Sequence, residues 1–214
     1  MGLIALNCAL FLYELLLGQD LRGFMMTWGL VPVRVTQALQ FGDQPLLPTL
    51  VTLATSMFLH GGWAHLLGNM WYLWIFGDNV EDRLGHVRFL CFYLGGGIVA
   101  ALTQYAIDPS AAVPTVGASG AIAAVLGAYA VTFPRARVVT LLPLLLFWPI
   151  VRLPALAVLG GWFVIQFFNG ALGLAWMVGG SVAWWAHIGG FVFGMLAMRL
   201  MTPRRVALSG ANPV

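Results

Sequence analysis

GASGAIAAVLGAYAVTF, residues 117–133, is the stretch that decides how this chain folds. Its first four residues, Gly117-Ala118-Ser119-Gly120, place a hydroxyl at the start of a run of small apolar side chains, and Pro134 follows the run. The run predicts a helix over Ser119–Phe133 that neighbouring helices can approach closely, because small residues let two backbones come together.

The composition places this helix in a membrane. Hydrophobic residues make up 61% of the 214 residues and charged residues only 8%, whereas soluble domains carry roughly 25% charged residues. Lipid offers no partner for backbone polar groups, so recurring apolar stretches favour helices. We predict an all-α integral membrane protein with six transmembrane helices. The expected spans are Leu3–Leu17, Met57–Phe76, Phe89–Ala106, Ser119–Phe133, Leu153–Phe168 and Val182–Met201.

Two further segments connect these spans. The loop over Gly18–Ser56 is long and partly apolar, so we expect partial burial at the outer interface. Val138–Val151 is apolar but lies between two arginines, and it corresponds to about 22 Å of helix against a hydrocarbon core of roughly 30 Å. With Pro143 and Pro149 inside it, we expect an interfacial or re-entrant segment and no seventh span.

The arginines predict the orientation. With six spans, eight of the ten basic residues fall on one side and only Arg22 and Arg34 on the other. Both termini are then cytoplasmic, in an inner bacterial membrane. The net charge of +3 reports this orientation, and no nucleic-acid partner is expected. We expect a transmembrane domain over residues 1–202 and a short flexible cytoplasmic tail over 203–214. Glu14 is interpreted as a carboxylate at headgroup level near the outer end of the first span.

Four polar side chains share one predicted depth in the membrane. Ser119 starts a span too short to reach the outer surface, so it lies about 8 Å below that surface. His187 lies five residues into the last span, and His65 and Asn69 lie four residues apart on one face of the second. Gly190 and Gly194 continue the stripe of His187, which predicts packing against the small residues after Ser119.

These residue types suit hydrolysis at a serine. A hydroxyl attacks well only when a base removes its proton, and a neutral imidazole can do so. Ser119 is the candidate nucleophile and His187 the candidate base. Asn69, His65 and the Ser119 backbone N–H could stabilise an oxyanion. The acidic residues lie elsewhere in the sequence, so we expect a dyad.

Other interpretations fit each residue taken singly. Ser119 could be a helix N-cap, and His65, Asn69 and His187 could form hydrogen bonds between helices. His60, His65 and His187 could bind a metal, but the sequence has no HExxH pattern and no intramembrane carboxylate near these histidines, so we expect neither metal nor cofactor. A small-solute channel or transporter would favour paired ionisable residues and internal repeats.

Together the motifs resemble the rhomboid family of intramembrane serine proteases over nearly the whole chain. The resemblance rests on His60, His65 and Asn69 (HxxxxHxxxN), Glu81 and Arg83 (ExR), Gly117 to Gly120 (GxSG), and Ala186, His187, Gly190 and Gly194 (AHxxGxxxG). It implies cleavage of transmembrane protein substrates in the lipid bilayer by Ser119 and His187, with His65, Asn69 and the Ser119 amide stabilising the oxyanion.

The resemblance also assigns supporting roles. His60, Glu81, Arg83 and the motif glycines Gly117, Gly120, Gly190 and Gly194 would be structural. The loop after the first span would be a membrane-embedded element. The fifth span, with Trp162, Phe163, Phe167 and Phe168, and the loop to Val182 would form a lateral gate and cap. An inactive relative that binds transmembrane helices is the alternative, and the sequence leaves the oligomeric state open.

Overall fold

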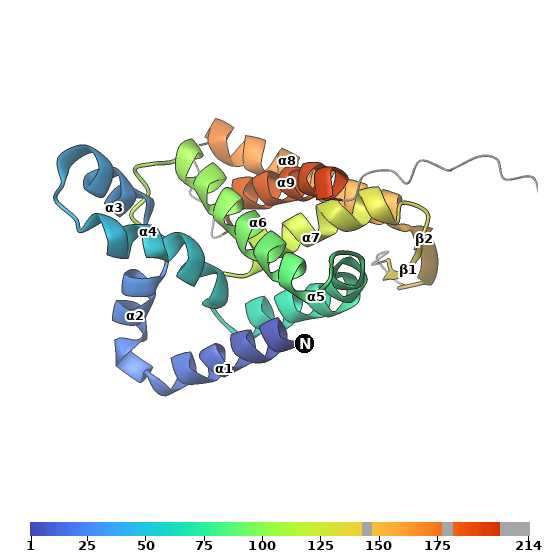
Figure 1. Ribbon diagram of the computed structural model, residues 1–214, viewed down its shortest axis with the longest axis horizontal. Helices are drawn as coiled ribbons and strands as arrows, with labels where there is room; N and C mark the ends of the chain where they lie inside the picture. The colour runs from blue at the N-terminus through green and yellow to red at the C-terminus, as the bar shows by residue number, and fades with distance from the viewer. Residues whose placement is uncertain (143–146, 177–181, 202–214) are drawn as a thin grey trace, which may run out of the picture.

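The computed structural model describes residues 1–142, 147–176 and 182–201 (Figure 1). The described part is mostly helical. Its helices and strands are α1 (Gly2–Leu16), η1 (Gly18–Asp20), α2 (Leu21–Trp28), α3 (Pro32–Thr36), η2 (Gln37–Phe41), α4 (Leu46–Thr55), η3 (Ser56–Phe58), α5 (Trp63–Leu84), α6 (His86–Ile107), α7 (Ser119–Thr132), β1 (Arg137–Leu141), β2 (Ile150–Pro154), α8 (Ala155–Trp176) and α9 (Trp184–Met201).

Helix α7 is the centre of the bundle. It contacts α5, α6, α8 and α9, and every residue from Gly120 to Ala130 is buried. Alanine and glycine predominate along it, so the neighbouring helices can approach its backbone closely. Figure 1 shows α6, α7 and α9 lying side by side, with α8 next to α9. The short, small-residue helix predicted over Ser119–Phe133 is therefore present, and it forms the core of the molecule.

The segment between α1 and α5 is folded into short helices. After α1 the chain bends by 113° into η1 and α2, and α3, η2, α4 and η3 follow. Leu30 and Val35 are buried against Ala101 of α6. Leu30 also forms an isolated antiparallel bridge with Thr115. The segment expected as a loop is thus a set of short helices. It packs against α6 and is joined by the Leu30–Thr115 bridge to the segment that leads into α7.

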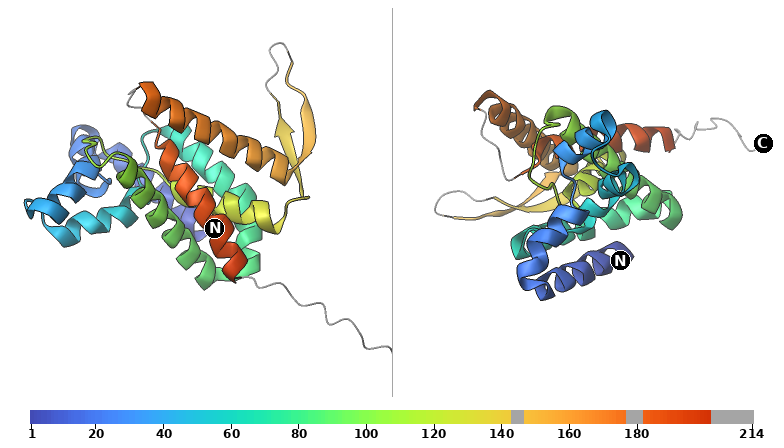
Figure 2. Two further views of the ribbon diagram at one scale, coloured as in Figure 1. Left: turned by 90° about the horizontal axis from the view of Figure 1, so that it is seen from above. Right: turned by 90° about the vertical axis from the view of Figure 1, so that its left-hand side faces the viewer.

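Most described residues of Val138–Val151, the segment expected to be interfacial or re-entrant, belong to an antiparallel pair of β-strands, called the hairpin below. Strands β1 and β2 pair antiparallel from Arg137 opposite Pro154 to Leu141 opposite Ile150. Burial alternates along both strands, as the two faces of a hairpin require. Figure 2 shows the hairpin projecting away from the helices. The prediction considered helical geometry alone, although the segment is rich in β-branched residues, which favour strands.

Two expected boundaries also differ from the structure. The second span was expected from Met57, but Met57 lies in η3 and α5 begins at Trp63 and continues to Leu84. The fifth was expected over Leu153–Phe168, whereas Leu153 belongs to β2 and α8 runs from Ala155 to Trp176. Gly62, directly before α5, has a φ of 151°. This positive φ, which glycine adopts readily, lets the backbone turn into the helix.

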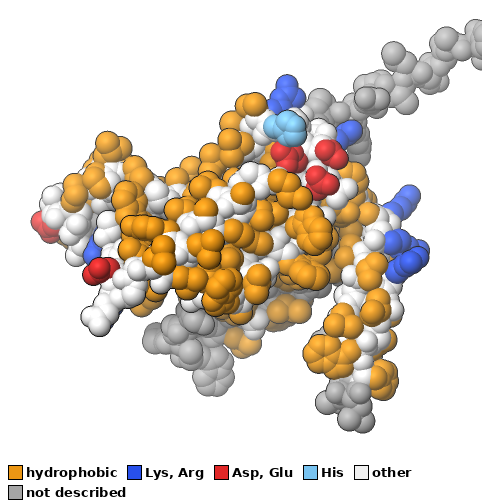
Figure 3. All heavy atoms as spheres, turned by 90° about the horizontal axis from the view of Figure 1, so that it is seen from below, with side chains coloured by type: hydrophobic (Ala, Val, Ile, Leu, Met, Phe, Trp, Pro, Cys, Tyr) orange, Lys and Arg blue, Asp and Glu red, His pale blue; other side chains and the backbone are white. Residues whose placement is uncertain are grey.

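Hydrophobic side chains cover much of the surface. In the described part of the chain, α6 and Ala155–Leu174 of α8 are long and apolar enough to cross a membrane, and the bent pair α1 with η1 and α2 would make a third candidate. Figure 3 shows a face that is largely hydrophobic, with charged side chains near both ends of the helical part and on the hairpin. The protein is therefore a membrane protein with apolar helices on its outside.

Candidate active site

Ser119 is the first residue of α7, and the turn before it positions the hydroxyl. Gly117 has a φ of +124°, a backbone conformation that L side chains rarely adopt. Its backbone N–H donates to the carbonyl of Ser56, 2.9 Å away. The backbone N–H of Ser119 belongs to the first turn of α7, where amides have no partner within the helix. Ser119 therefore presents a side-chain hydroxyl and a backbone donor at the same helix end.

His187 comes to Ser119 through the close packing of α9 on α7. A Cβ placed on Gly190 would overlap the carbonyl oxygen of Gly120, and one on Gly194 would overlap that of Ala124. The two backbones are thus in direct contact, in agreement with the small-residue stripe in the sequence. His187 lies one turn before Gly190 and is 9% exposed.

A hydrogen bond joins the two candidate catalytic side chains. His187 Nε2 lies 2.8 Å from Ser119 Oγ, although the residues are 68 positions apart in the chain. This is the distance at which a general base can take a proton from a hydroxyl. The structure therefore brings together Ser119 and His187, the candidate nucleophile and the candidate base, from two different helices.

His65 lies beside this pair. A Cβ on Gly117 would lie 2.6 Å from both Cε1 and Nε2 of His65 and 3.7 Å from Ser119 Oγ. Nδ1 of His65 accepts a long hydrogen bond of 3.4 Å from the backbone N–H of Gly61. Because Nδ1 accepts, the proton of a neutral His65 ring is on Nε2, one of the two ring atoms closest to the Cβ position of Gly117. His65 can therefore serve as a donor at the candidate site.

Asn69 lies one turn after His65 on α5 and is 7% exposed. Its side-chain Nδ2 is buried and has no hydrogen-bond partner among the described residues. Buried amide donors are normally paired, and exceptions often mark a functional site. This unpaired donor agrees with the predicted role of Asn69 toward a developing negative charge.

His60 and Glu14 form a buried contact behind the site. Glu14 is 1% exposed, and both of its carboxylate oxygens accept from the backbone N–H of His60 at 3.3 Å. The interpretation of Glu14 as a headgroup-level carboxylate was therefore wrong. The ring of His60 packs edge-on against His65, with centroids 5.3 Å apart. Glu14 and His60 thus support the segment that leads into α5.

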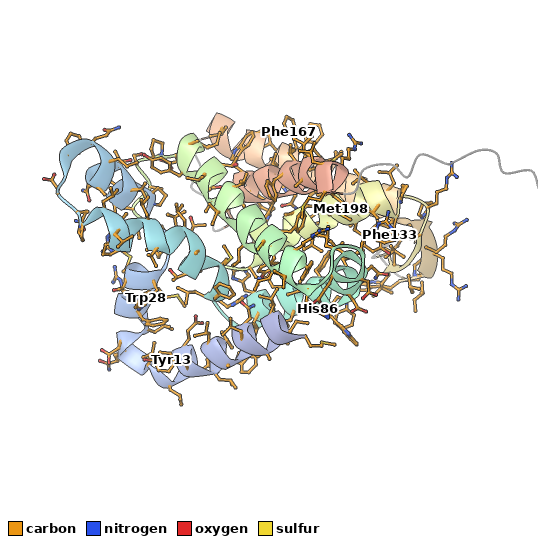
Figure 4. All side chains as sticks on the ribbon, in the orientation of Figure 1. Tyr13, Trp28, His86, Phe133, Phe167 and Met198 are labelled. Carbon is orange, nitrogen blue, oxygen red and sulfur yellow. The ribbon has the colours of Figure 1, made fainter. Side chains whose placement is uncertain are left out.

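The ExR element lies at the opposite end of α5 from His65. Glu81 accepts from His86 Nδ1 at 2.7 Å, and Arg83 is exposed in the last turn of the helix. Figure 4 labels His86 at the start of α6, where this contact joins α5 to α6. Neither side chain of the element is part of the Ser119 site.

Gln166 is the residue near the site that sequence reasoning missed. Its Oε1 lies 2.7 Å from His187 Nδ1, and its side chain is 6% exposed on α8. A signal was present, because Gln166 is an amide inside the apolar run GWFVIQFF, residues 161–168. A polar side chain inside a membrane helix usually forms a hydrogen bond to a neighbouring helix.

Four aromatic residues of α8 were expected at a lateral gate, and three of them contact rings of α9, with Phe167 lying 6.2 Å from Trp185. Trp162 and Phe163 face α9, with ring centroids 5.8 Å from His187 and 4.9 Å from Phe191 respectively. Phe167 and Phe168 are 46% and 60% exposed, and Figure 4 labels Phe167 on α8 and Met198 on α9.

Of the expected cap, residues 177–181 lie outside the described residues, as does the expected tail, 203–214. In the described ranges, no group of three His, Cys, Asp or Glu side chains could hold a metal ion.

Comparison with known proteins defines the class. The Rhomboid domain matches residues 48–204, which is most of the chain. The chain therefore belongs to the rhomboid family.

Its relatives include mitochondrial and bacterial proteins. It is 32% identical over 149 residues to presenilin-associated rhomboid-like protein A, mitochondrial, of Danio rerio, covering 65% of this chain and 34% of that protein. It is 27% identical over 178 residues to the corresponding Homo sapiens protein, covering 78% and 42%. It is 43% identical over 76 residues to rhomboid protease GluP of Bacillus subtilis (strain 168), covering 36% and 14%. The chain thus spans less than half the length of these curated relatives.

Proposed function

We propose that this protein is an intramembrane serine endopeptidase that hydrolyses peptide bonds in or near the transmembrane segments of membrane proteins. The observation that carries the proposal is the 2.8 Å contact between Ser119 Oγ and His187 Nε2, made between two helices of the apolar bundle. Membership in the rhomboid family, with relatives that include a rhomboid protease, supports the same activity.

In the first half of the reaction, Ser119 is the nucleophile and His187 the general base. His187 Nε2 takes the hydroxyl proton while Oγ attacks the carbonyl carbon of the scissile bond. The carbonyl oxygen becomes negatively charged in the tetrahedral intermediate. His187 then gives its proton to the departing amine, the C–N bond breaks, and an acyl ester remains on Ser119.

In the second half, water replaces the amine. His187 takes a proton from water as the water oxygen attacks the ester, and it returns that proton to Ser119 Oγ when the ester breaks. The oxyanion of each step would be stabilised by the Ser119 backbone N–H, the Asn69 amide and His65. The unpaired buried Nδ2 of Asn69 supports its part in this set.

The substrate class follows from the location of the site in an apolar bundle. A peptide bond within a helix is shielded by its own hydrogen bonds and side chains, so the cleaved segment has to unwind locally. We propose transmembrane segments with small residues at the cleaved bond and helix-weakening glycine or proline nearby. Water would reach Ser119 from the outer side along the irregular segment 108–118, since such backbone is tolerated at membrane depth only beside a wet or protein-lined cavity.

We also propose that six segments cross the membrane, namely α1, α5, α6, α7, α8 and α9, with both termini cytoplasmic in a bacterial inner membrane. Eight of the ten arginines then lie on the cytoplasmic side. A domain over residues 1–202 would carry the activity. Glu81 and Arg83 would stabilise the cytoplasmic end of α5, and the exposed Phe167 and Phe168 of α8 would face substrate or lipid.

A fluorophosphonate probe tests the enzyme directly. We expect the purified wild-type protein to be labelled and to cleave a reporter transmembrane substrate, and Ser119→Ala and His187→Ala to do neither. If the wild type binds the reporter but cleaves it no faster than Ser119→Ala, the protein is an inactive binder of transmembrane helices and the proposal is wrong. Equal labelling of wild type and Ser119→Ala would also contradict it.

A further inference from the structure

The imidazole of His187 is held through both of its nitrogens. Nε2 lies 2.8 Å from Ser119 Oγ on α7, and Nδ1 lies 2.7 Å from Gln166 Oε1 on α8. Both Gln166 and His187 are buried, at 6% and 9% exposure. Three helices thus meet at one ring, in the order Ser119, His187, Gln166.

This order selects the tautomer of the ring. An amide oxygen accepts and cannot donate, so the contact with Gln166 Oε1 requires the ring proton on Nδ1. A neutral imidazole carries one such proton, and Nε2 is then left with a lone pair facing Ser119. This is the only neutral tautomer in which His187 can act as the base toward Ser119.

Helix α8 also fixes the direction of the ring. Trp162 lies four residues before Gln166, on the same face of α8, and its ring is 5.8 Å from that of His187 at an interplanar angle of 37°. Trp184 contacts the ring edge-on at 6.3 Å. A hydrogen bond at Nδ1 and an aromatic face from the same helix leave the imidazole little freedom to rotate.

We propose that Gln166 is the positioning residue of His187: its side-chain oxygen holds the proton on Nδ1, so that Nε2 is free to take the Ser119 proton. This inference rests on the proposed function and adds a neutral third member to the pair. When Nε2 receives the proton, Gln166 Oε1 remains as the acceptor for the imidazolium. An amide performs this task in an apolar bundle without the large desolvation cost of a carboxylate.

The test compares three variants with the wild type in the full chain. Gln166→Met keeps the length and unbranched shape of the side chain but removes the oxygen acceptor. Gln166→Glu keeps an oxygen acceptor. Asn169→Leu is the matched control, a polar-to-apolar change one turn further along α8. We would measure kcat and KM on the reporter substrate, the thermal unfolding midpoint, and the ¹⁵N shifts of histidine-labelled protein, assigned for His187 by comparison with His187→Ala.

For Gln166→Met we expect kcat to fall about 10- to 100-fold, the range for one lost orienting hydrogen bond, with KM changed less than about threefold. We expect Gln166→Glu to recover activity to within about tenfold of the wild type, and Asn169→Leu to match the wild type. The ¹⁵N shifts should place the proton of His187 on Nδ1 in the wild type and lose that preference in Gln166→Met.

Wild-type kcat in Gln166→Met, or a wild-type spectrum with the proton on Nε2, would overturn the inference. If Gln166→Met does not fold, the wild-type and Gln166→Glu spectra decide the question. The ¹⁵N spectra are also recorded for Ser119→Ala. This variant tests, in a protein that cannot react, whether the Gln166 contact alone keeps the His187 proton on Nδ1. An inactive wild type whose His187 carries its proton on Nδ1 would refute the proposed function and leave the tautomer assignment standing.

Discussion

At the scale of single residues, Gly117 controls how closely His65 approaches Ser119. It has a positive φ, and the position of its missing Cβ is only 2.6 Å from the His65 ring. A glycine is required for both reasons, because a side chain would be strained by the backbone and would also collide with the ring. The geometry of the site therefore depends on the absence of one methyl group.

We predict that Gly117→Ala lowers the rate of fluorophosphonate labelling about 10- to 100-fold, because it displaces His65 or Ser119 from their relative positions. Gly85→Ala is the matched control, since Gly85 has a φ of 79° and open space around its missing Cβ. The control should carry the backbone strain, about 1–3 kcal/mol, and label at nearly the wild-type rate. Equal labelling losses in the two variants would show that strain alone explains the effect.

At the scale of elements, the contact between α7 and α9 determines whether Ser119 and His187 can meet. The stretch that touches consists of Gly120, Ala124 and Gly127 on α7 and Gly190 and Gly194 on α9. The missing Cβ atoms of Gly127, Gly190 and Gly194 point at backbone atoms of the other helix, which cannot move aside as a flexible side chain can. The distance between Ser119 Oγ and His187 Nε2 thus depends on the backbone contact between α7 and α9, which begins at Gly190, one turn after His187.

We predict that Gly190→Val reduces the free energy of unfolding by about 1–3 kcal/mol and removes most activity, because the added side chain forces α9 away from Gly120. Gly161→Val makes the same change on α8, where a Cβ meets nothing within 4 Å. Thermal unfolding and reporter cleavage would be measured for both. Wild-type activity in Gly190→Val would remove the close contact as a requirement of the site.

At the scale of the whole molecule, the apolar surface and the distribution of arginines relate the protein to its membrane. The hairpin and the α5–α6 junction carry charged side chains beside an otherwise largely hydrophobic face (Figure 3). In the proposed arrangement the hairpin and the α5–α6 junction lie on the cytoplasmic side of the membrane. The segment around Asp43 lies on the outer side.

Cysteine labelling tests this arrangement. Cys8 and Cys91 are free thiols and would first be replaced by alanine. Both side chains are exposed, and the six-span arrangement places them on opposite sides of the membrane. We therefore predict that Asp43→Cys reacts with a membrane-impermeant thiol reagent in intact cells, and that Arg135→Cys reacts only after the membrane is opened. Reaction of both positions in intact cells would contradict the six-span arrangement.

Some features were predictable because they depend on local pattern. The helix from Ser119 and the small-residue stripes were visible as spacing along the chain, and they led to the Ser119–His187 pair. The burial of Glu14 was not predictable, because its partner is the backbone of His60, 46 positions away. Gln166 was missed for a similar reason, since the direction in which α8 points it is set by packing on α9.

The amino-acid sequence by itself determined that this is a helical membrane protein with a hydroxyl and an imidazole carried on helices of small residues, because composition and periodicity are properties of the chain alone. Only the tertiary structure decided the 2.8 Å contact between Ser119 and His187, the hydrogen bond from His187 to Gln166, and the antiparallel pairing of β1 with β2. These features arise where distant segments contact one another, and hydrogen bonds and backbone collisions act over distances that spacing along a sequence does not specify.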